Sequence, residues 1–373
     1  MNNHVHSGSD GEIHVVRTGT SIVPELSVGS EKPSREWLSF HVFYTASSRP
    51  LISQCIGPLV SDLRKNDLIH GYFFINYWLE GPHVRLRLLP SYPKLTAEVR
   101  ERTENSIANF LRIRPALYEV TSDHLLTYYD MLFAAEYPET DRSPYLDANG
   151  RMRLRNNNTF TVEKYEPEYD RYGGRAGMTL AEWHFEQSSD LVVAIDRTMN
   201  VHLRSVRLGV SAQLMLVMAT AFLGDTLEVV RFMDSYTDFW KRSFAGTAFA
   251  DDTAHAHAFE ADSTRVSNHL TAIHNSQQDG KSHGLPPFLK RWAEHSCELA
   301  SRIRDASERM RFHSAVRNGN GEPLPVDRVL RLLLNSYLHM TNNRLSTTIG
   351  DECYLAFVIA RSLEQHELKD GTP

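Results

Sequence analysis

The chain has 373 residues, of which 41% are hydrophobic and 23% are charged, and its formal net charge is -6. This composition is typical of a soluble globular protein, and the negative balance argues against a broad nucleic-acid-binding surface. Its apolar runs are shorter than the roughly 20 residues that span a bilayer. Cys55, Cys297 and Cys353 lack CxxC spacing, so we expect reduced thiols in a cytoplasmic protein.

The first 35 residues differ in character from the rest. Residues 1–35 are polar and rich in Ser and Gly, and they lack the basic and apolar regions of a signal peptide. We expect a disordered tail there and one domain over residues 36–369. Within this domain, residues 36–175 are rich in strand patterns, whereas residues 176–369 have helical patterns.

The sheet-rich part has the order strand, helix, strand, strand, helix, strand. Alternating and β-branched residues predict strands at 37–44, 72–78, 83–89 and 159–165. Apolar residues at helical spacing predict helices at 50–63, 94–113 and 123–136. If the helix predicted at 123–136 is set aside, the order is βαββαβ. This is the order of a ferredoxin-like antiparallel sheet.

The C-terminal part is predicted to be helical throughout. Helices are expected at 180–199, 205–223, 227–244, 254–277, 287–312, 325–341 and 350–368. The segment 205–223 is apolar almost all round but carries Arg207 and Gln213, which is typical of a buried helix. The predicted fold class is α+β, in which a small ferredoxin-like antiparallel sheet near the N-terminus packs with a largely helical C-terminal half.

The stretch HGYFFINYWLEGPHVRLRLL, residues 70–89, carries an unusual cationic face. Because side chains alternate along a strand, His83, Arg85 and Arg87 share one face, and the apolar residues between them share the other. Two neighbouring arginines repel one another unless an anion or acidic partner lies over them. A solvated edge strand is the alternative. The apolar strand before it favours a central hairpin and an anion site.

Two later segments gather further polar residues. In YEPEYDRYGG, residues 165–174, the two glycines permit positive φ beside Arg171, although a tight turn with an exposed arginine explains them equally well. In HMTNNRL, residues 339–345, a histidine, two asparagines and an arginine follow an apolar helix. Helix capping and the helix dipole are the structural alternative there.

The three motifs, in this order, resemble the C-terminal domain of class I lantibiotic dehydratases, which also occurs alone in thiopeptide-type bacteriocin biosynthesis proteins. The resemblance covers residues 37–368. It implies a lyase that removes glutamate from glutamylated Ser or Thr of a precursor peptide and leaves dehydroalanine or dehydrobutyrine. The family's essential arginines and histidine correspond to Arg87, Arg171 and His339, and all three identities are retained.

The chemistry suits these residue types. Histidine exchanges protons near neutral pH, so we expect His339 to transfer the proton, and the planar arginine fork binds carboxylates. Further substrate-binding candidates are His83, Arg85, Tyr172, Asn343 and Arg344. The chain departs from some family members at Asn76, where those members have arginine, and at Thr341, where some have histidine. The region between the first two motifs is also longer than in the simplest members, which implies a different substrate fit.

Two other functions compete with elimination. Some stand-alone proteins with this domain are pyridine synthases, which join two dehydroalanines by a formal [4+2] cycloaddition and expel the leader peptide, a reaction that does not need the Arg, Arg, His set. A non-catalytic subunit that binds the precursor peptide is the third option. No cofactor or metal is expected. The expected partners are the precursor peptide and a separate glutamyl-tRNA-dependent glutamylating protein, without direct nucleic-acid or membrane contact, and a homodimer is one option for the assembly.

Overall fold

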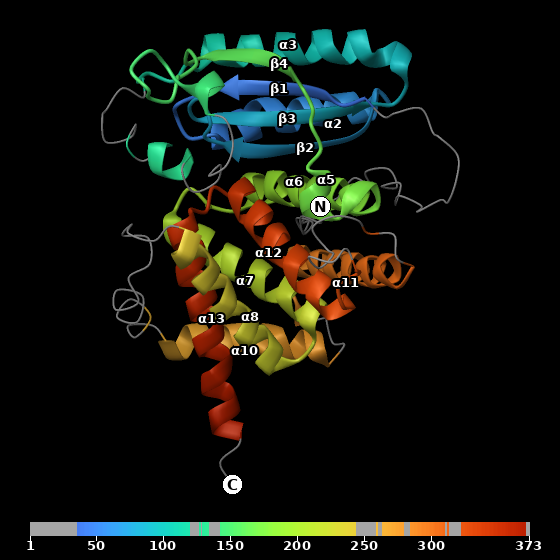
Figure 1. The fold of residues 1–373 in the computed structure, drawn as a ribbon, viewed down its shortest axis with the longest axis vertical. Coiled ribbons are helices and arrows are strands. Elements are labelled where there is room, and N and C mark those ends of the chain that lie inside the picture. The colour runs from blue at the N-terminus through green and yellow to red at the C-terminus, as the bar shows by residue number, and fades with distance from the viewer. Residues whose placement is uncertain are drawn as a thin grey trace, which may run out of the picture.

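The computed structural model describes residues 36–119, 127, 129–133, 142–243, 259, 263–279, 284–309, 312 and 322–370, with backbone only at 243 and 366–370. The expected tail at 1–35 lies outside this range, as do parts of the helices expected at 123–136 and 254–277. The described residues form a four-stranded sheet with flanking helices, and a helical half on which the sheet rests (Figure 1).

The sheet has the predicted ferredoxin-like topology. Its strands are β1 (Leu38–Phe43), β2 (Ile69–Tyr77), β3 (His83–Pro90) and β4 (Thr159–Lys164). They lie in the order β2-β3-β1-β4, and every neighbouring pair is antiparallel. The α+β prediction is therefore confirmed. The pairing of β1 with β3 brings together the side chains of two strands that are far apart in sequence.

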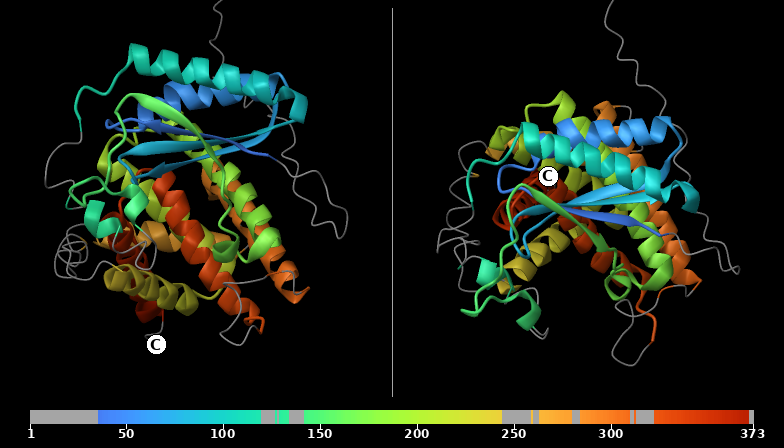
Figure 2. Two further views of the ribbon diagram at one scale, coloured as in Figure 1. Left: turned by 45° about the horizontal axis from the view of Figure 1, so that its top comes forward. Right: turned by 90° about the horizontal axis from the view of Figure 1, so that it is seen from above.

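Two helical segments accompany the sheet. The first is a continuous helical run with a π-helical centre: α1 (Arg49–Leu51), η1 (Ile52–Ile56) and α2 (Gly57–Lys65). The second comprises η2 (Pro93–Leu95) and α3 (Thr96–Ile113). A short 3-10 helix, η3 (Ser143–Tyr145), precedes β4. The helix α3 lies on the side of the sheet away from the C-terminal helices (Figure 1), and α2 and α3 run side by side (Figure 2).

The C-terminal helices follow the predicted pattern with shifts of a few residues. They are α5 (Tyr169–Tyr172), α6 (Gly174–Thr198), α7 (Arg204–Leu223), α8 (Thr226–Ser243), α10 (Ser263–Gln278), α11 (Pro287–Glu308), α12 (Val326–Arg344) and α13 (Ile349–Asp370). Because α12 continues to Arg344, Asn342 and Asn343 lie inside its last turn. The chain leaves the helix just beyond them, where Ser346 has a φ of 58°.

The sheet meets the helical half at β2. Both α6 and α12 pack against this strand. The prediction of a central hairpin is thus right for β3 and wrong for β2, which is an edge strand. Since helices cover it, Tyr72 and Phe74 are almost fully buried, and the strand is as apolar as an inner one. One cluster of buried apolar side chains continues from the sheet into the helices.

The apolar helix α7 is a core helix. Among the described segments it alone is long and apolar enough to cross a membrane, and 67% of its most apolar stretch is buried within the fold. Residues 215–220 and Phe222, near its C-terminal end, are at most 5% exposed. This burial confirms the predicted core helix. Cys55, Cys297 and Cys353 are not joined to one another by disulfides.

Candidate functional site

The predicted cationic face lies on the inner strand β3 and is extended by β1. In the antiparallel register, Ser39 is opposite Arg87 and His41 is opposite Arg85. Because opposite residues point to the same face of a sheet, the two β1 side chains join His83, Arg85 and Arg87. The face predicted from β3 alone is therefore a polar cluster built from two strands.

Arg87 is a buried cation without a counter-charge among the described residues. Its side chain is only 6% exposed, and its Nε and Nη1 have no hydrogen-bond partner among the described residues. Nη2 lies 3.5 Å from Nε2 of His41, and the guanidinium lies 5.4 Å from the centre of the Tyr165 ring. Burial, and secondarily Arg85, lowers the pKa of Arg87 to about 9, so the group is still charged at neutral pH. Each unsatisfied donor costs roughly 1–3 kcal/mol.

Arg85 and His83 form a second pair beside Arg87. Arg85 donates from Nε to Nε2 of His83 over 3.1 Å, and its guanidinium stacks 3.5 Å from the centre of the Tyr77 ring. His83 is buried and donates from Nδ1 to the carbonyl of Gly81 at 2.8 Å. The structure thus brings the three predicted residues of β3 together on one face.

Arg171 lies beyond the sheet, on the short helix α5 that leads into α6. Gly173 has a φ of 85°, so the predicted positive φ in the RYGG turn is confirmed. The exposed Arg171 side chain pairs with Glu168 at 3.2 Å and donates from Nε to Ser336 Oγ at 3.3 Å. Ser336 belongs to α12 and lies one turn before His339. The contact places Arg171 beside the helix that carries the predicted histidine.

Tyr172, the neighbour of Arg171, is a core residue. It is 1% exposed, and its ring stacks on that of Tyr337 with centroids 5.9 Å apart. Burial raises the pKa of its phenol to about 12, and its hydroxyl has no hydrogen-bond partner in the described part of the chain. Its predicted role in substrate binding stays a prediction.

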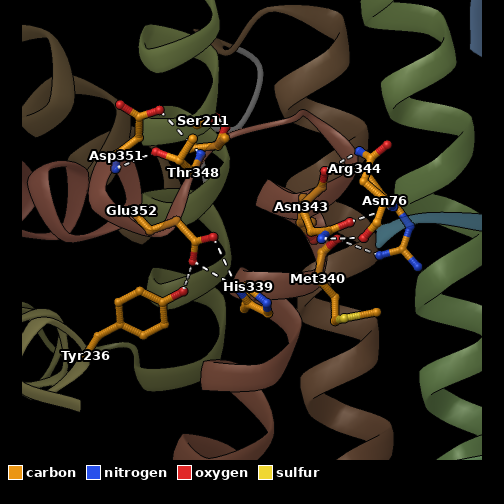
Figure 3. A network of polar contacts seen from close by, with 12 residues as sticks. Asn76, Ser211, Tyr236, His339, Met340, Asn343, Arg344, Thr348, Asp351 and Glu352 are labelled. Atoms are coloured by element: carbon orange, nitrogen blue, oxygen red, sulfur yellow. Dashed lines mark hydrogen bonds and ion pairs between the residues drawn. The ribbon is translucent and has the colours of Figure 1, made fainter. Parts of the chain in front are cut away.

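His339 is held by a buried carboxylate (Figure 3). Its Nδ1 lies 3.1 Å from Oε1 of Glu352, which is completely buried, and the other carboxylate oxygen accepts a hydrogen bond from Tyr236. The His339 ring lies 4.8 Å from that of Trp240, and its side chain is 19% exposed. A proton on Nδ1, facing Glu352, leaves the lone pair on Nε2. This arrangement suits a base whose orientation is fixed.

The last two predicted residues bind other parts of the protein. Asn343 pairs with the backbone of Asn76: its Oδ1 accepts from the backbone N–H at 2.9 Å, and its Nδ2 donates to the carbonyl at 2.8 Å. Arg344 is 1% exposed and donates to Ser189 and to the carbonyl of Met340. Burial lowers the pKa of Arg344 to about 9. Substrate binding by Asn343 and Arg344 stays a prediction.

Aromatic rings connect the two groups of predicted residues. Rings stand in sequence from Tyr165, which covers Arg87, through Phe73 and Phe185 to Tyr172, with successive centroids 5.9, 5.4 and 5.4 Å apart. Arg171, on α5, contacts the helix α12 that carries His339, and Arg87 lies on the sheet across this aromatic layer. The presence of functional residues in all three motifs predicts one pocket lined by Arg87, Arg171 and His339, and this stays a prediction. Within the described residues, no group of three His, Cys, Asp or Glu side chains is arranged to hold a metal ion.

Comparison with known proteins defines the family. The family model described as "Lantibiotic biosynthesis dehydratase C-term" matches residues 37–363. The chain therefore belongs to the family of lantibiotic dehydratase C-terminal domains, as the three motifs predict, and it is a protein of the biosynthesis of ribosomally made, modified peptides. A search of curated protein sequences finds no significant match.

Solved structures with this fold include both stand-alone proteins and a larger enzyme. The pyridine synthase TbtD from thiomuracin biosynthesis is 18% identical with a TM-score of 0.65, over 88% of this chain and 98% of its own. TsrL is 16% identical with a TM-score of 0.60, over 89% and 95%. The tRNA-dependent lantibiotic dehydratase MibB from Microbispora sp. 107891 is 16% identical with a TM-score of 0.57, over 92% of this chain and 29% of its own.

Proposed function

We propose that the chain is a stand-alone elimination enzyme that removes glutamate from glutamylated Ser or Thr of a precursor peptide. The product is dehydroalanine or dehydrobutyrine, and the reaction class is that of a lyase. A separate glutamyl-tRNA-dependent protein supplies the ester, and the elimination takes place in the cytoplasm. The family supports a role in peptide modification, and the proposed reaction rests on the side chains described above.

The observation that carries the proposal is the unneutralised guanidinium of Arg87. No carboxylate pairs with it in the described part of the chain, although burial makes an isolated charge costly. A cation kept in this state is suited to an anionic ligand, and arginine binds a carboxylate in bidentate form. The glutamyl adduct carries a free carboxylate, whereas a dehydroalanine side chain carries no charge.

The proposed chemistry assigns one step to each residue. His339 takes the Cα proton on Nε2, the electron pair forms the Cα=Cβ bond, and the bond from Cβ to the ester oxygen breaks. Glutamate leaves as a carboxylate, and the imidazolium returns its proton to solvent. Glu352 stabilises the imidazolium that forms, while Arg87 and Arg171 hold the glutamyl group and balance the developing charge. This pair of a partly exposed histidine and a buried carboxylate also argues for an enzyme over a peptide-binding subunit without catalysis.

A pyridine synthase is the second candidate. The chain matches 98% of the length of the thiomuracin pyridine synthase, and 29% of the length of the dehydratase. A formal [4+2] cycloaddition would join two dehydroalanines and expel the leader peptide. This reaction uses uncharged side chains, and it gives no reason for a buried, unpaired arginine.

Two peptides separate the candidates. The purified chain is given a precursor peptide that carries a glutamylated serine and, separately, a peptide that already contains dehydroalanines. Elimination predicts released glutamate and a dehydroalanine from the first peptide, and no change in the second. A pyridine-containing macrocycle and a freed leader from the second peptide, with the first unchanged, would show that the proposal is wrong and that the second candidate is right.

A further inference from the structure

Each arginine of the sheet face is contacted by one histidine. Arg87 Nη2 lies 3.5 Å from His41 Nε2, and Arg85 Nε lies 3.1 Å from His83 Nε2. The two imidazole rings stack on one another with centroids 5.1 Å apart. The face therefore holds two parallel Arg–His pairs, one anchored on β1 and one within β3.

The contacts fix the protonation of both rings. A guanidinium has donors only, so a histidine nitrogen that faces it must accept. Nε2 of His41 and of His83 therefore carries the lone pair, and the proton of each ring is on Nδ1. For His83 this assignment has independent support, because its Nδ1 lies 2.8 Å from the carbonyl oxygen of Gly81, which only accepts. A doubly protonated ring would point an N–H at an arginine N–H.

The surroundings keep both rings neutral. Arg85, Arg87 and Arg155 face both histidines, and His83 faces His41. Burial first, and then the charge of Arg85, lowers the pKa of His41 to about 2 and that of His83 to about 3. Both rings are therefore uncharged at neutral pH, and they add no charge to the face.

We propose that His41 and His83 are positioning residues, which hold Arg87 and Arg85 as neutral hydrogen-bond acceptors and leave both guanidinium charges for an anionic group of the substrate. A carboxylate in either position would orient the arginine equally well but would cancel its charge. Under the proposed function, the anionic group is a carboxylate of the glutamyl adduct, and this identification rests on that function. His83 then acts through Arg85 and does not touch the substrate itself.

Two hydroxyl groups on the same face are available to this ligand. Ser39 lies opposite Arg87 and Thr161 lies opposite His41. Their hydroxyl oxygens are buried and have no partner among the residues that the structure describes. With Arg87 Nε and Nη1, they form a group of unsatisfied donors at one place. Such a group is expected where a ligand completes the hydrogen bonding.

Binding of two probes tests the positioning role. The first probe is a precursor peptide in which a stable amide replaces the glutamyl ester, and the second is glutarate. The test variants are His41→Leu and His83→Leu, which remove the acceptor. His41→Gln and His83→Gln restore an acceptor without an imidazole, and His70→Leu, at an exposed histidine of β2, is the control. We expect each Leu variant to weaken binding about tenfold, since a hydrogen bond to a charged group is lost. Both Gln variants should recover most of the affinity.

Nitrogen NMR on the ¹⁵N-histidine-labelled protein tests the charge state without relying on any variant to bind. The signals of His41 and His83, assigned by their loss in the Gln variants, should show a protonated Nδ1 and an unprotonated Nε2 down to about pH 4. A ring that takes up a second proton near pH 6, or Leu variants that bind both probes as tightly as the unaltered chain, would overturn the proposal. Histidine-dependent glutarate binding without glutamate release from the ester would support the anion site and contradict elimination.

Discussion

His339 Nδ1 lies 3.1 Å from Oε1 of Glu352, a carboxylate that is completely buried. Burial of a carboxylate is costly unless its oxygens are bonded, and here Tyr236 and His339 supply the bonds (Figure 3). The pairing ties the first turn of α13 to the end of α12. It also gives a physical reason for the orientation of a histidine that the three-motif pattern identifies only by position.

Replacing Glu352 with Gln should slow elimination. Glutamine can still accept the hydrogen bond from Nδ1, but it cannot stabilise an imidazolium by charge. We expect kcat for glutamate release to fall at least about tenfold. The loss should not exceed the roughly 10²–10⁴-fold that the general base as a whole contributes. Glu294→Gln, at an exposed position of α11, serves as the control. Equal rates for both variants would remove Glu352 from the mechanism.

A buried histidine pair should make stability depend on pH. His295 Nε2 lies 3.1 Å from His184 Nδ1, and both residues are buried. Burial lowers the pKa of His295 to about 3 and that of His184 also falls well below its ordinary value. The unfolded chain takes up protons below about pH 6.5 and the folded chain does not, so stability should fall as the pH drops from about 6.5 towards 3.

The variant His295→Gln keeps a polar side chain beside His184 but loses one titrating group. Its free energy of unfolding, measured in urea between pH 4 and pH 7, should change with pH less steeply, by about 1.4 kcal/mol per pH unit. An unchanged slope would mean that this histidine titrates alike in the folded and unfolded chain.

Asn343 should stabilise the junction between the sheet and the helical half. Its side chain bonds both the N–H and the carbonyl of Asn76 on the edge strand β2, much as a neighbouring strand would. Asn343→Asp loses the donor and sets a carboxylate against a carbonyl. The expected loss of stability is about 1–3 kcal/mol, measured by urea unfolding with Asn105→Asp, at an exposed site of α3, as the control. Matching midpoints for the two variants would contradict this role.

Deletion of residues 1–30 should leave the thermal midpoint nearly unchanged. This segment lacks the apolar pattern that a packed element requires. The midpoint is measured by calorimetry for the full and the shortened chain. A drop of several degrees would identify the segment as part of the folded structure.

The sequence predicts the strands and most helices because their apolar periods are strong, and the βαββαβ order then determines the sheet. That topology also pairs β1 with β3, so the place of His41 opposite Arg85 was within reach of sequence reasoning. The overlooked signal was the alternation in the segment from Ser39 to Phe43. The edge position of β2 was missed because the helices that cover it make its composition resemble that of an inner strand.

Glu352 carried no such signal. It lies 13 residues after His339, beyond a turn, and its contact depends on how α13 packs against α7 and α8. Nor does any local pattern show that Arg344 is buried against Ser189. Long-range packing determines both of these contacts, and no local period in a single sequence encodes such packing.

The proposed elimination depends above all on the binding of the glutamyl group by Arg87. Its most direct test is the rate at which the variant Arg87→Lys releases glutamate from a glutamylated precursor peptide. Lysine keeps the charge but cannot form the bidentate fork. We expect Arg87→Lys to release glutamate far more slowly than the unaltered chain, and Arg151→Lys, at an exposed position, to release it at the full rate. Release of glutamate at the full rate by Arg87→Lys would contradict this role of Arg87.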